Sequence, residues 1–324
     1  MNNRNRFGTI WARGIRCRAP LVFGDIPHEI EKYLTGYTFP MRRSVLIIGV
    51  AIVVLLIATA LIWYAVVRAG PGKLTVSFLN IGQGDAIFIE TPSGRQALID
   101  GGPNRIVLRE LGKVMPWYDR SIDVVIATHP DLDHIGGLVD VLARFDVGLI
   151  VESSVEDEKG TDAQALERAA SAEGARRLIA RRGHIIDLGD GVMIEILSPD
   201  RALPSVDTNL GCLVARVVYD GTSFMLPCDA PDEIEEYLVA LDGAELKSNV
   251  LKAGHHGSKT SSSPLFVGYV SPEWAVFSRG CDNSYGHPAP EVAERFKQFE
   301  IPTLDTCTDG RITFVSDGQS VRLK

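Results

Sequence analysis

The sequence predicts one α+β domain of about 250 residues that follows a single transmembrane helix. Two observations support this prediction. Residues 45–67 form a 23-residue apolar run without a charge, and beyond them short strand-like segments bounded by Gly and Pro turns alternate with helix-like segments. No internal repeat is visible, and a content of 45% hydrophobic residues can build a sizeable core, so a single layered domain is the simplest arrangement.

The apolar run reads VLIIGVAIVVLLIATALIWYAVV, lies between Arg42–Arg43 and Arg68, and contains the interfacial pair Trp63–Tyr64 near its end. At about 1.5 Å per residue, a helix of this length crosses a bilayer core of roughly 30 Å. A single-pass membrane anchor is therefore expected. A buried helix of a soluble protein and a cleaved signal peptide are alternatives, the latter because Ala58–Ala60 resembles a cleavage site.

The distribution of arginines predicts the orientation of this helix. Residues 1–44 hold seven arginines, whereas only Arg68 and Lys73 follow the apolar run directly. The positive-inside bias therefore predicts that residues 1–44 form a cytoplasmic tail and that the C-terminal domain is extracytoplasmic. Met41 is an alternative start of the chain, in which case residues 1–40 would not belong to the protein.

After a linker at residues 68–73, the domain is expected to span residues 74–324, with its elements read from turn signals and apolar periodicity. The expected strands are Leu74–Asn80, Ala86–Glu90, Gln96–Asp100, Ile122–Ala127, His184–Leu188, Val192–Leu197, Cys212–Tyr219, Ser223–Pro227 and Leu246–Lys252, with two more starting at Thr303 and Ile312. The expected helices are Arg105–Trp117, Ile135–Phe145, a solvated helix Asp162–Arg182, and Pro290–Phe299.

Charge and cysteine content narrow the classes of function. A net charge of -8 and a pI near 5.4 argue against a strongly basic nucleic-acid surface. Nucleic acid is still not excluded, because a metal site adds local positive charge. The five cysteines contain no CxxC pair, so neither a zinc ribbon nor a disulfide scaffold is expected, and most of them are expected to be small buried core residues. These cysteines are Cys17, Cys212, Cys228, Cys281 and Cys307.

The stretch THPDLDHIGG follows the expected strand Ile122–Ala127 and concentrates metal-ligand side chains. His129, Asp131, Asp133 and His134 lie on the loop between a strand end and a helix start, where closely spaced side chains can face one pocket. Imidazoles and carboxylates together are ligands for zinc, manganese or iron. A polar loop with helix-capping aspartates is the alternative.

Three further positions repeat this pattern downstream. Asp229 ends the apolar run TSFMLPCDA, His255–His256 end NVLKAGHHGSK, and His287 lies in NSYGHPAP. Each lies within a few residues of Gly or Pro, as expected of loops at one edge of a sheet. Taken singly, each has an ordinary explanation as a helix cap or a hydrogen-bonded histidine, but their recurrence predicts one shared site.

The motif THPDLDHIGG resembles the metal-binding signature of the metallo-β-lactamase superfamily. Companion stretches resemble the C-terminal hydrolase domain of ComEC-type competence DNA-uptake proteins, in the same order from about Lys73 to the end of the chain. These stretches are NIGQGDAIFIETPSGRQALIDGG, TNLGCLVARVVYDGTSFMLPCDA, LKAGHHGSKTSSSPLF and YGHPAPEV. The resemblance implies a four-layer αββα sandwich with the active site between the loop edges of its two sheets.

The resemblance also assigns roles to residues. His129 and Asp131 are similar to ligands of a first divalent ion, and Asp133 and His134 to ligands of a second. Asp229 resembles the carboxylate that bridges both ions. One histidine of the adjacent pair is expected to complete the second position, and the other to face the substrate as proton donor or phosphate contact. The residues of that pair are His255 and His256, and the sequence does not decide between them.

Further residues are expected around the metal ligands. Asp100 and Asp85 resemble aspartates that brace the ligands, with simple turn roles as the alternative. Ser258 and Lys259 are expected to contact a substrate phosphate, although a turn with a helix cap explains them equally well. Asn209 is expected near the substrate, as a stand-in for a histidine ligand that the chain lacks.

Three departures from the family pattern affect the first metal position. The commoner HxHxDH is HxDxDH here, and no histidine lies between His184 and His255. This position is therefore poorer in nitrogen ligands and weaker, or better suited to Mn²⁺ than to Zn²⁺. Cys228 stands where similar sequences tend to carry glycine, which makes a thiolate ligand an alternative.

These features predict a hydrolase that holds two divalent ions, zinc or manganese, around a shared hydroxide, with one of the downstream histidines, His287 included, protonating the leaving oxygen. The leading hypothesis is a phosphodiesterase or nuclease-like enzyme whose phosphoester substrate is single-stranded DNA. Hydrolysis of another envelope ester or of a lactone is one alternative, and a non-catalytic metal-binding or ligand-binding protein on the same fold is another. No protein partner is evident.

Overall fold

The computed structural model describes residues 43–69, 72–155, 160–202 and 207–324. The chain divides into two compact units, Met1–Arg68 and Ala69–Lys324. Almost all of the expected cytoplasmic tail, together with Cys17, lies outside the described residues.

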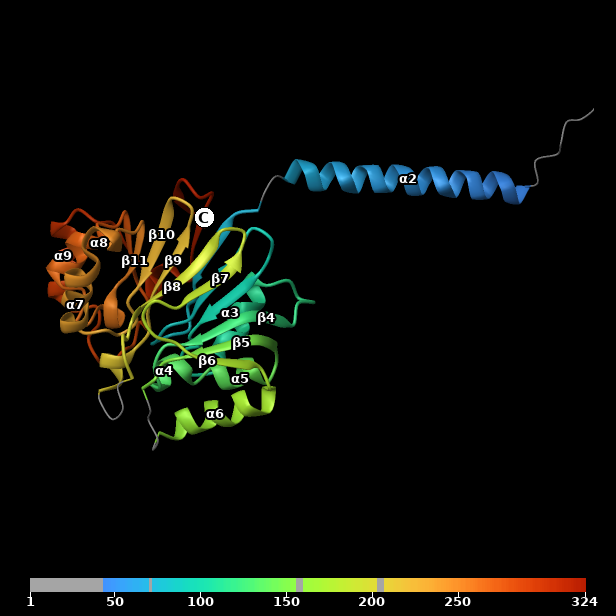
Figure 1. The fold of residues 1–324 in the computed structure, drawn as a ribbon. Coiled ribbons are helices and arrows are strands. Elements are labelled where there is room, and N and C mark those ends of the chain that lie inside the picture. Colours follow the sequence, from blue (N-terminus) through green and yellow to red (C-terminus); the bar gives the residue numbers. More distant parts are fainter. Residues whose placement is uncertain (1–42, 70–71, 156–159, 203–206) are drawn as a thin grey trace, which may run out of the picture. The chain divides into compact units, whose positions relative to one another are not determined.

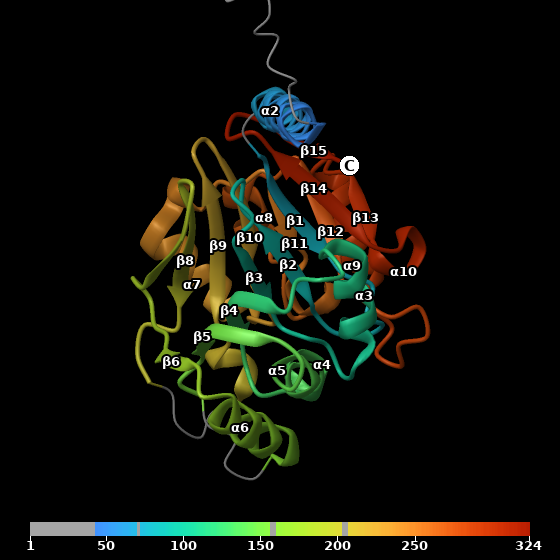
Figure 2. The ribbon, with the colours of Figure 1, turned by 90° about the vertical axis from the view of Figure 1, so that its right-hand side faces the viewer.

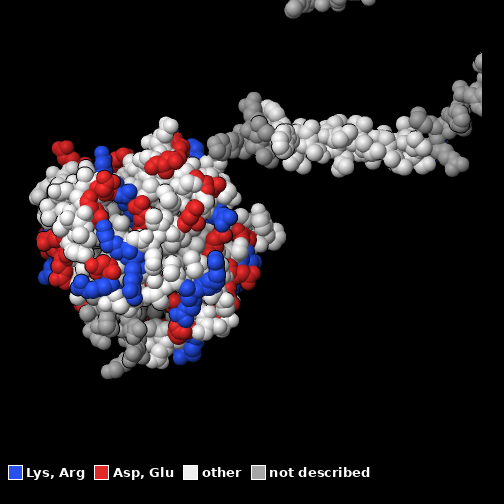
Figure 3. All heavy atoms as spheres, viewed as in Figure 1, with Lys and Arg blue, Asp and Glu red and all other residues white. Residues whose placement is uncertain are grey.

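The first unit contains the helix α2 (Arg43–Ala69). Its segment Arg43–Tyr64 has a mean hydropathy of 3.3 and none of it is buried, and within the described ranges it is the one helix long and apolar enough to cross a membrane. The predicted apolar helix is therefore confirmed. Figure 3 shows the middle of this helix without blue or red side chains.

Two sheets form the body of the second unit (Figures 1 and 2). The first sheet has the order β15-β14-β1-β2-β3-β4-β5-β6, and the second has the order β13-β12-β11-β10-β9-β8-β7. The strands of the first sheet are β1 (Leu74–Phe78), β2 (Ile87–Glu90), β3 (Gln96–Ile99), β4 (Ser121–Ala127), β5 (Asp146–Glu152), β6 (Arg176–Ile179), β14 (Ile312–Ser316) and β15 (Val321–Leu323). Those of the second are β7 (Ile185–Gly189), β8 (Val192–Ser198), β9 (Val214–Tyr219), β10 (Thr222–Leu226), β11 (Val250–Lys252), β12 (Trp274–Phe277) and β13 (Thr303–Asp305).

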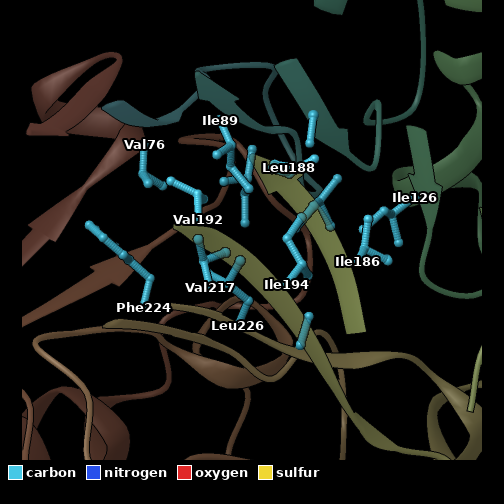
Figure 4. Packing of buried hydrophobic residues seen from close by; sticks show 14 of the residues in the cluster. Val76, Ile89, Ile126, Ile186, Leu188, Val192, Ile194, Val217, Phe224 and Leu226 are labelled. Carbon is cyan, nitrogen blue, oxygen red and sulfur yellow. The ribbon is translucent and has the colours of Figure 1, made fainter. Parts of the chain in front are cut away.

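The sheets pack face to face over an apolar core, drawn in Figure 4. Strand β4 shows how the sequence builds it, because alternate side chains of a strand point to opposite faces. Val124 and Ile126 belong to the core between the sheets, whereas Val125, which lies between them, faces the outer helices. Near-perpendicular ring contacts add to this core, as between Phe78 and Phe314, whose centroids lie 6.2 Å apart.

Helices cover the outer face of each sheet, which gives the predicted four-layer αββα sandwich. Buried residues of α3 (Ile106–Val114), α5 (Leu138–Leu142) and α6 (Thr161–Glu173) pack on the first sheet. Buried residues of α7 (Asp232–Asp242), α8 (Pro264–Val270) and α9 (Pro290–Gln298) pack on the second. Short helices complete the described elements, namely α4 (Leu132–Ile135), α10 (Thr306–Asp309), η1 (Thr208–Gly211), η2 (Gly243–Leu246) and η3 (Gly254–Gly257).

Several predicted elements were wrong or missing. The helix expected at Asp162–Arg182 ends at Glu173, because Gly174 adopts φ 78° and caps it, and β6 follows. The helix expected at Ile135–Phe145 is interrupted at Gly136–Gly137, where a side chain on Gly137 would lie 2.1 Å from Gly101 O. Strands β5 and β12 and helices α7 and α8 were not predicted, because short apolar segments do not show their type by periodicity.

The cysteine prediction was also partly wrong. Cys212 and Cys228 are buried free thiols, as expected. Cys281 and Cys307 form a disulfide that joins the loop after β12 to α10. The 26-residue separation along the chain gave no local signal, because pairing depends on the distance between Cα atoms, here 5.0 Å, and not on sequence spacing.

Candidate metal centre

The site-forming loops meet at one end of the sandwich. Strand β1 ends at this edge, because Phe78 pairs with Ile87 and the loop between them carries Asp85. The chain therefore enters β1 at the opposite end, at Leu74. Parallel strands place their carboxyl ends side by side, so the loops after β4 and β11 also reach this edge. The converging side chains are Asp85 before β2, Asp100 after β3, His129, Asp131, Asp133 and His134 after β4, Asp229 after β10, and His255 and His256 after β11.

Asp229 is the centre of this cluster. Its Oδ2 lies 3.2 Å from His256 Nε2 and 3.3 Å from His134 Nε2. His255 Nε2 lies 3.5 Å from the same oxygen. Asp133 extends the group, because its Oδ2 is 3.5 Å from His256 Nε2. Asp133, His134 and His256 place their ligand atoms within 4.8 Å of one another, which is the arrangement expected around one cation.

A second group lies on the other side of His134. The rings of His129 and His134 are 4.1 Å apart, and His129 Nε2 lies 3.6 Å from Asp131 Oδ2. Asp131 is part-exposed, and its Oδ1 accepts a 2.7 Å hydrogen bond from Thr208 Oγ1. His129, His134 and Cys228, all buried, also place their ligand atoms within 4.8 Å of one another, so the second group can be completed by Asp131 or by the Cys228 sulfur.

The imidazoles in this cluster are not explained by hydrogen bonding within the described chain. His129 Nε2, His134 Nε2 and His256 Nε2 are buried and make no hydrogen bond, although carboxylate oxygens lie 3.2 to 3.6 Å away. Buried polar atoms without partners are costly, so they imply a missing binding partner. Three such nitrogens among carboxylates fit divalent metal ions in chemistry and in placement.

Braces behind the ligands fix their orientation. Asp100 accepts hydrogen bonds from Thr128 N (2.9 Å) and Thr128 Oγ1 (2.7 Å), and its Oδ2 lies 2.8 Å from His134 Nδ1. His256 Nδ1 donates to Ser278 O over 2.8 Å. With Nδ1 engaged in this way, the Nε2 atoms of both rings keep their lone pairs for a metal. Asp100 therefore contacts the Nδ1 side of His134, away from the free Nε2.

The backbone around the ligands adopts an uncommon conformation. Asp100, Cys228, His255 and His256 all have φ between 47° and 58°, in the left-handed region that L residues seldom occupy. Such strain costs about 1–3 kcal/mol per residue and persists where the surrounding structure holds it, often at functional sites. Gly84 is needed for close approach, since a Cβ there would lie 1.9 Å from Asp133 O.

Charges in the metal-free cluster are strongly coupled. Burial alone would raise the pKa of Asp229, but the neighbouring His256, His134 and Lys252 hold it well below its usual range. Burial alone would lower the pKa of His134 and of His256, but Asp229 raises both well above the usual value. In the metal-free protein the protonated imidazoles therefore supply the positive charge beside Asp229. A metal ion that binds to these nitrogens must displace their protons.

Lys252 was missed by the sequence analysis, and so were Thr128, Thr208 and Ser278. The Lys252 ammonium is fully buried, 2.5 Å from Asp85 Oδ2 and 3.3 Å from Asp229 Oδ1. The sequence did contain a signal for Lys252, which ends an apolar strand close to two histidines. A lysine that is buried at such a place must be paired with acceptors.

The two adjacent histidines differ in exposure. His256 is fully buried, whereas the side chain of His255 is 30% exposed and its ring lies 5.9 Å from that of His287. His287 also stacks on Tyr285, and its Nδ1 is buried without a hydrogen bond. Burial lowers the pKa of both His255 and His287, which leaves their rings neutral at pH 7.

Other predicted residues are not brought to the ligands in the same way. Ser258 Oγ lies 3.0 Å from Thr260 Oγ1, and Lys259 is exposed. On η1 it is Thr208, and not Asn209, that binds Asp131, although Asn209 Oδ1 is buried and makes no hydrogen bond to any residue that the structure describes.

Cys228 lies beside the first group. Its Sγ is 3.3 Å from His129 Nδ1, and the thiol is buried. Burial raises the pKa of Cys228 well above its usual value, so the thiol form faces the ring in the metal-free protein.

A four-layer sandwich with clustered histidines and aspartates at one loop edge defines a class of proteins that generally act as metal-dependent hydrolases. Residues 79–273 match the Metallo-beta-lactamase superfamily, and the chain belongs to this superfamily.

Among characterised relatives, the chain is similar to Competence protein ComA of Neisseria gonorrhoeae, with 32% identity over 75% of this chain and 32% of that protein. It is similar to ComE operon protein 3 of Bacillus subtilis (strain 168), with 29% identity over 74% of this chain and 32% of that protein. The chain thus spans about a third of the length of these relatives. The resemblance to competence proteins is confirmed.

Among solved structures, the diiron beta-hydroxylase CmlA from Streptomyces venezuelae has a TM-score of 0.50 and 14% identity, covering 75% of this chain and 54% of that one. At this identity the likeness shows the fold alone.

Proposed function

We propose that the chain is a membrane-anchored, metal-dependent phosphodiesterase with a nuclease-like active site. The observation that carries this proposal is the set of three buried imidazole nitrogens without hydrogen bonds, on His129, His134 and His256, facing the carboxylates of the loop edge. Buried imidazole nitrogens without hydrogen bonds, placed among carboxylates, have the chemistry and the placement of metal ligands.

Two metal positions are supported unequally. Asp133, His134, His256 and Asp229 Oδ2 would hold one ion, and the ligand atoms of the first three lie within 4.8 Å of one another. His129 and Asp131 would hold a second ion, zinc or manganese, beside Asp229. When bound, such ions supply Lewis acidity and an activated water at neutral pH.

The exposed histidines would move the proton. His255 Nε2 is neutral at pH 7 and lies at the mouth of the cluster, where a leaving oxygen can reach it. A neutral ring can first accept the proton that the attacking water loses and then deliver that proton to the leaving oxygen. His287, whose ring centre lies 5.9 Å from that of His255, is the second neutral imidazole that could serve as proton donor.

The substrate proposal rests on the relatives and on space near the ligands. One relative is named a competence protein, and the resemblance of the motifs to competence DNA-uptake proteins makes single-stranded DNA the proposed substrate. A cavity of about 530 Å³ opens beside His129 and Pro130 and provides room for the rest of a phosphodiester. Lys and Arg alternate with Asp and Glu on the face drawn in Figure 3, so affinity for a polyanion would come mainly from the metal centre.

The test is turnover by the full chain in detergent. Loaded with Mn²⁺ or Zn²⁺, it should cleave bis-p-nitrophenyl phosphate and single-stranded DNA, and chelation should stop both reactions. A lactone serves as the comparison substrate for a different hydrolase class. If the metal-loaded, folded protein cleaves neither phosphodiester, the phosphodiesterase proposal is wrong.

The anchor and its orientation are a second part of the proposal. The segment at residues 45–67 would span the membrane, residues 68–73 would link it, and residues 74–324 would form the extracytoplasmic domain. Arg42–Arg43 before the span support a cytoplasmic N-terminus. The Cys281–Cys307 disulfide supports the same orientation, because disulfides persist in oxidising compartments. Protease digestion of intact spheroplasts should degrade the domain, and full protection would reverse the assignment.

A further inference from the structure

Lys252 is a fully buried cation at the end of the sandwich where the candidate metal ligands meet. It is the last residue of β11, and alternation along the strand puts its side chain on the same face as Val250, which belongs to the core between the sheets. Its side chain is 0% exposed. A lysine in such a place requires a specific set of acceptors, because an unpaired buried ammonium is strongly unfavourable.

The ammonium group has three hydrogens, and three oxygens surround it. Asp85 Oδ2 lies 2.5 Å away, Cys228 O 3.1 Å and Asp229 Oδ1 3.3 Å. Every donor of the ammonium is therefore matched by an acceptor, and two of the acceptors are carboxylates.

The ammonium lies beside a group of candidate metal ligands. Asp85, His134 and Asp229 bring ligand atoms within 4.8 Å of one another. Lys252 Nζ contacts Asp85 Oδ2 and Asp229 Oδ1, whereas Asp85 Oδ1 and Asp229 Oδ2 lie on the side of the histidines. The lysine therefore engages one oxygen of each carboxylate and leaves the other oxygen to the cluster.

We infer that Lys252 is a permanent cation of the metal centre that positions Asp229. It holds Oδ1 and leaves Oδ2 as the one oxygen of this carboxylate directed at His134, His255 and His256. Asp85 is the counter-ion that retains the ammonium, through its Oδ2. The inference rests on the proposed function only through metal binding by Asp229.

The inference is tested by a double-mutant cycle of Asp85→Asn and Lys252→Met in the full chain. The double variant removes one cation and one anion, so the net charge of the site is unchanged and no charge of the pair is left unmatched. Its affinity for Mn²⁺, measured by calorimetry, therefore reports the position of Asp229. Lys247→Met, an exposed lysine just before β11, is the matched control.

The double variant should bind Mn²⁺ about 10–100-fold more weakly than the wild type, the usual loss when a residue that orients a ligand is removed. The control should bind as the wild type does. Wild-type affinity in the folded double variant would show that Lys252 merely balances the charge of Asp85, and would overturn the inference.

If the wild type binds no Mn²⁺, the proposed function fails. The same variants then still test the pairing of Asp85 with Lys252 through a measurement without metal. Thermal unfolding without metal should show that each single substitution lowers the melting temperature and that the double variant loses less than the sum of the two. Additive losses would mean that Asp85 and Lys252 are not a pair, and the inference would be wrong. If Lys252→Met alone does not fold, a folded double variant supports the pairing, and a double variant that also fails to fold contradicts it.

Discussion

Asp100 offers a sharp test of how the metal ligands are oriented, through the variant Asp100→Asn. The wild-type carboxylate has only donors around it, namely Thr128 N at 2.9 Å, Thr128 Oγ1 at 2.7 Å and His134 Nδ1 at 2.8 Å. If the new amide group faces Thr128 N, two donors oppose each other. If it faces His134, the ring must accept at Nδ1 and carry its proton on Nε2, the atom that faces Asp229.

Either arrangement weakens the site by an amount that the contacts allow us to bound. Loss of a residue that orients a metal ligand costs about 10–100-fold in affinity. At 1.4 kcal/mol for each tenfold change, this is about 1.4–2.8 kcal/mol, comparable to one charge-assisted hydrogen bond at about 1.5–3 kcal/mol.

Calorimetric titration with Zn²⁺ measures the affinity, and ¹⁵N NMR of the imidazoles reports the tautomer of His134. The control is Asp146→Asn, because Asp146 is exposed at the start of β5. A folded Asp100→Asn protein that binds Zn²⁺ as tightly as the wild type would refute the orientation argument.

Three other predictions follow from the same contacts. Asp133→Ala should abolish turnover of bis-p-nitrophenyl phosphate while the circular dichroism spectrum stays native, because Asp133 is part-exposed and supplies ligand atoms, not core packing; retained turnover would remove Asp133 from the site. The metal-free protein should lose stability as pH rises above 6.5, because Asp229 outweighs burial and raises the pKa of His134 and of His256 well above the usual value, so the stability that is fully present below pH 6.5 is lost at higher pH. Mn²⁺ affinity should rise over the same range, and a flat profile would contradict both expectations. Cys281→Ser should lower the free energy of unfolding by about 3.5 kcal/mol, because the disulfide closes a 26-residue loop, and should lower the melting temperature by roughly 7–14 °C. Thermal unfolding with and without reductant measures this loss, and no change would show that the disulfide does not form.

Secondary structure was predictable where local signals were strong. The apolar helix, the strand before THPDLDHIGG and the helix that starts at Pro290 were all expected near their observed positions. The prediction of secondary structure failed where a segment changes from helix to strand within a few residues. After Glu173 the charged segment continues with Arg176–Ile179 as an edge strand, because pairing with β5 overrides the helical composition.

The candidate site was predictable in its ligand types, and less so in its internal assignments. The spacing of His129, Asp131, Asp133 and His134 on one loop needs no tertiary information. The roles of His255 and His256 were left open by the sequence, because neighbouring residues look equivalent until the backbone turns. In the structure η3 buries His256 against Ser278 and leaves His255 at the surface.

The sequence by itself determined the membrane-type helix, the family and the kinds of side chain at the site, since these depend on composition and on spacing over a few residues. Only the tertiary structure decided that Lys252 sits between Asp85 and Asp229, that Thr208 binds Asp131, and that Cys281 pairs with Cys307. The physical reason is that burial and pairing are properties of distances between loops far apart in the chain, and those distances are set when two sheets pack.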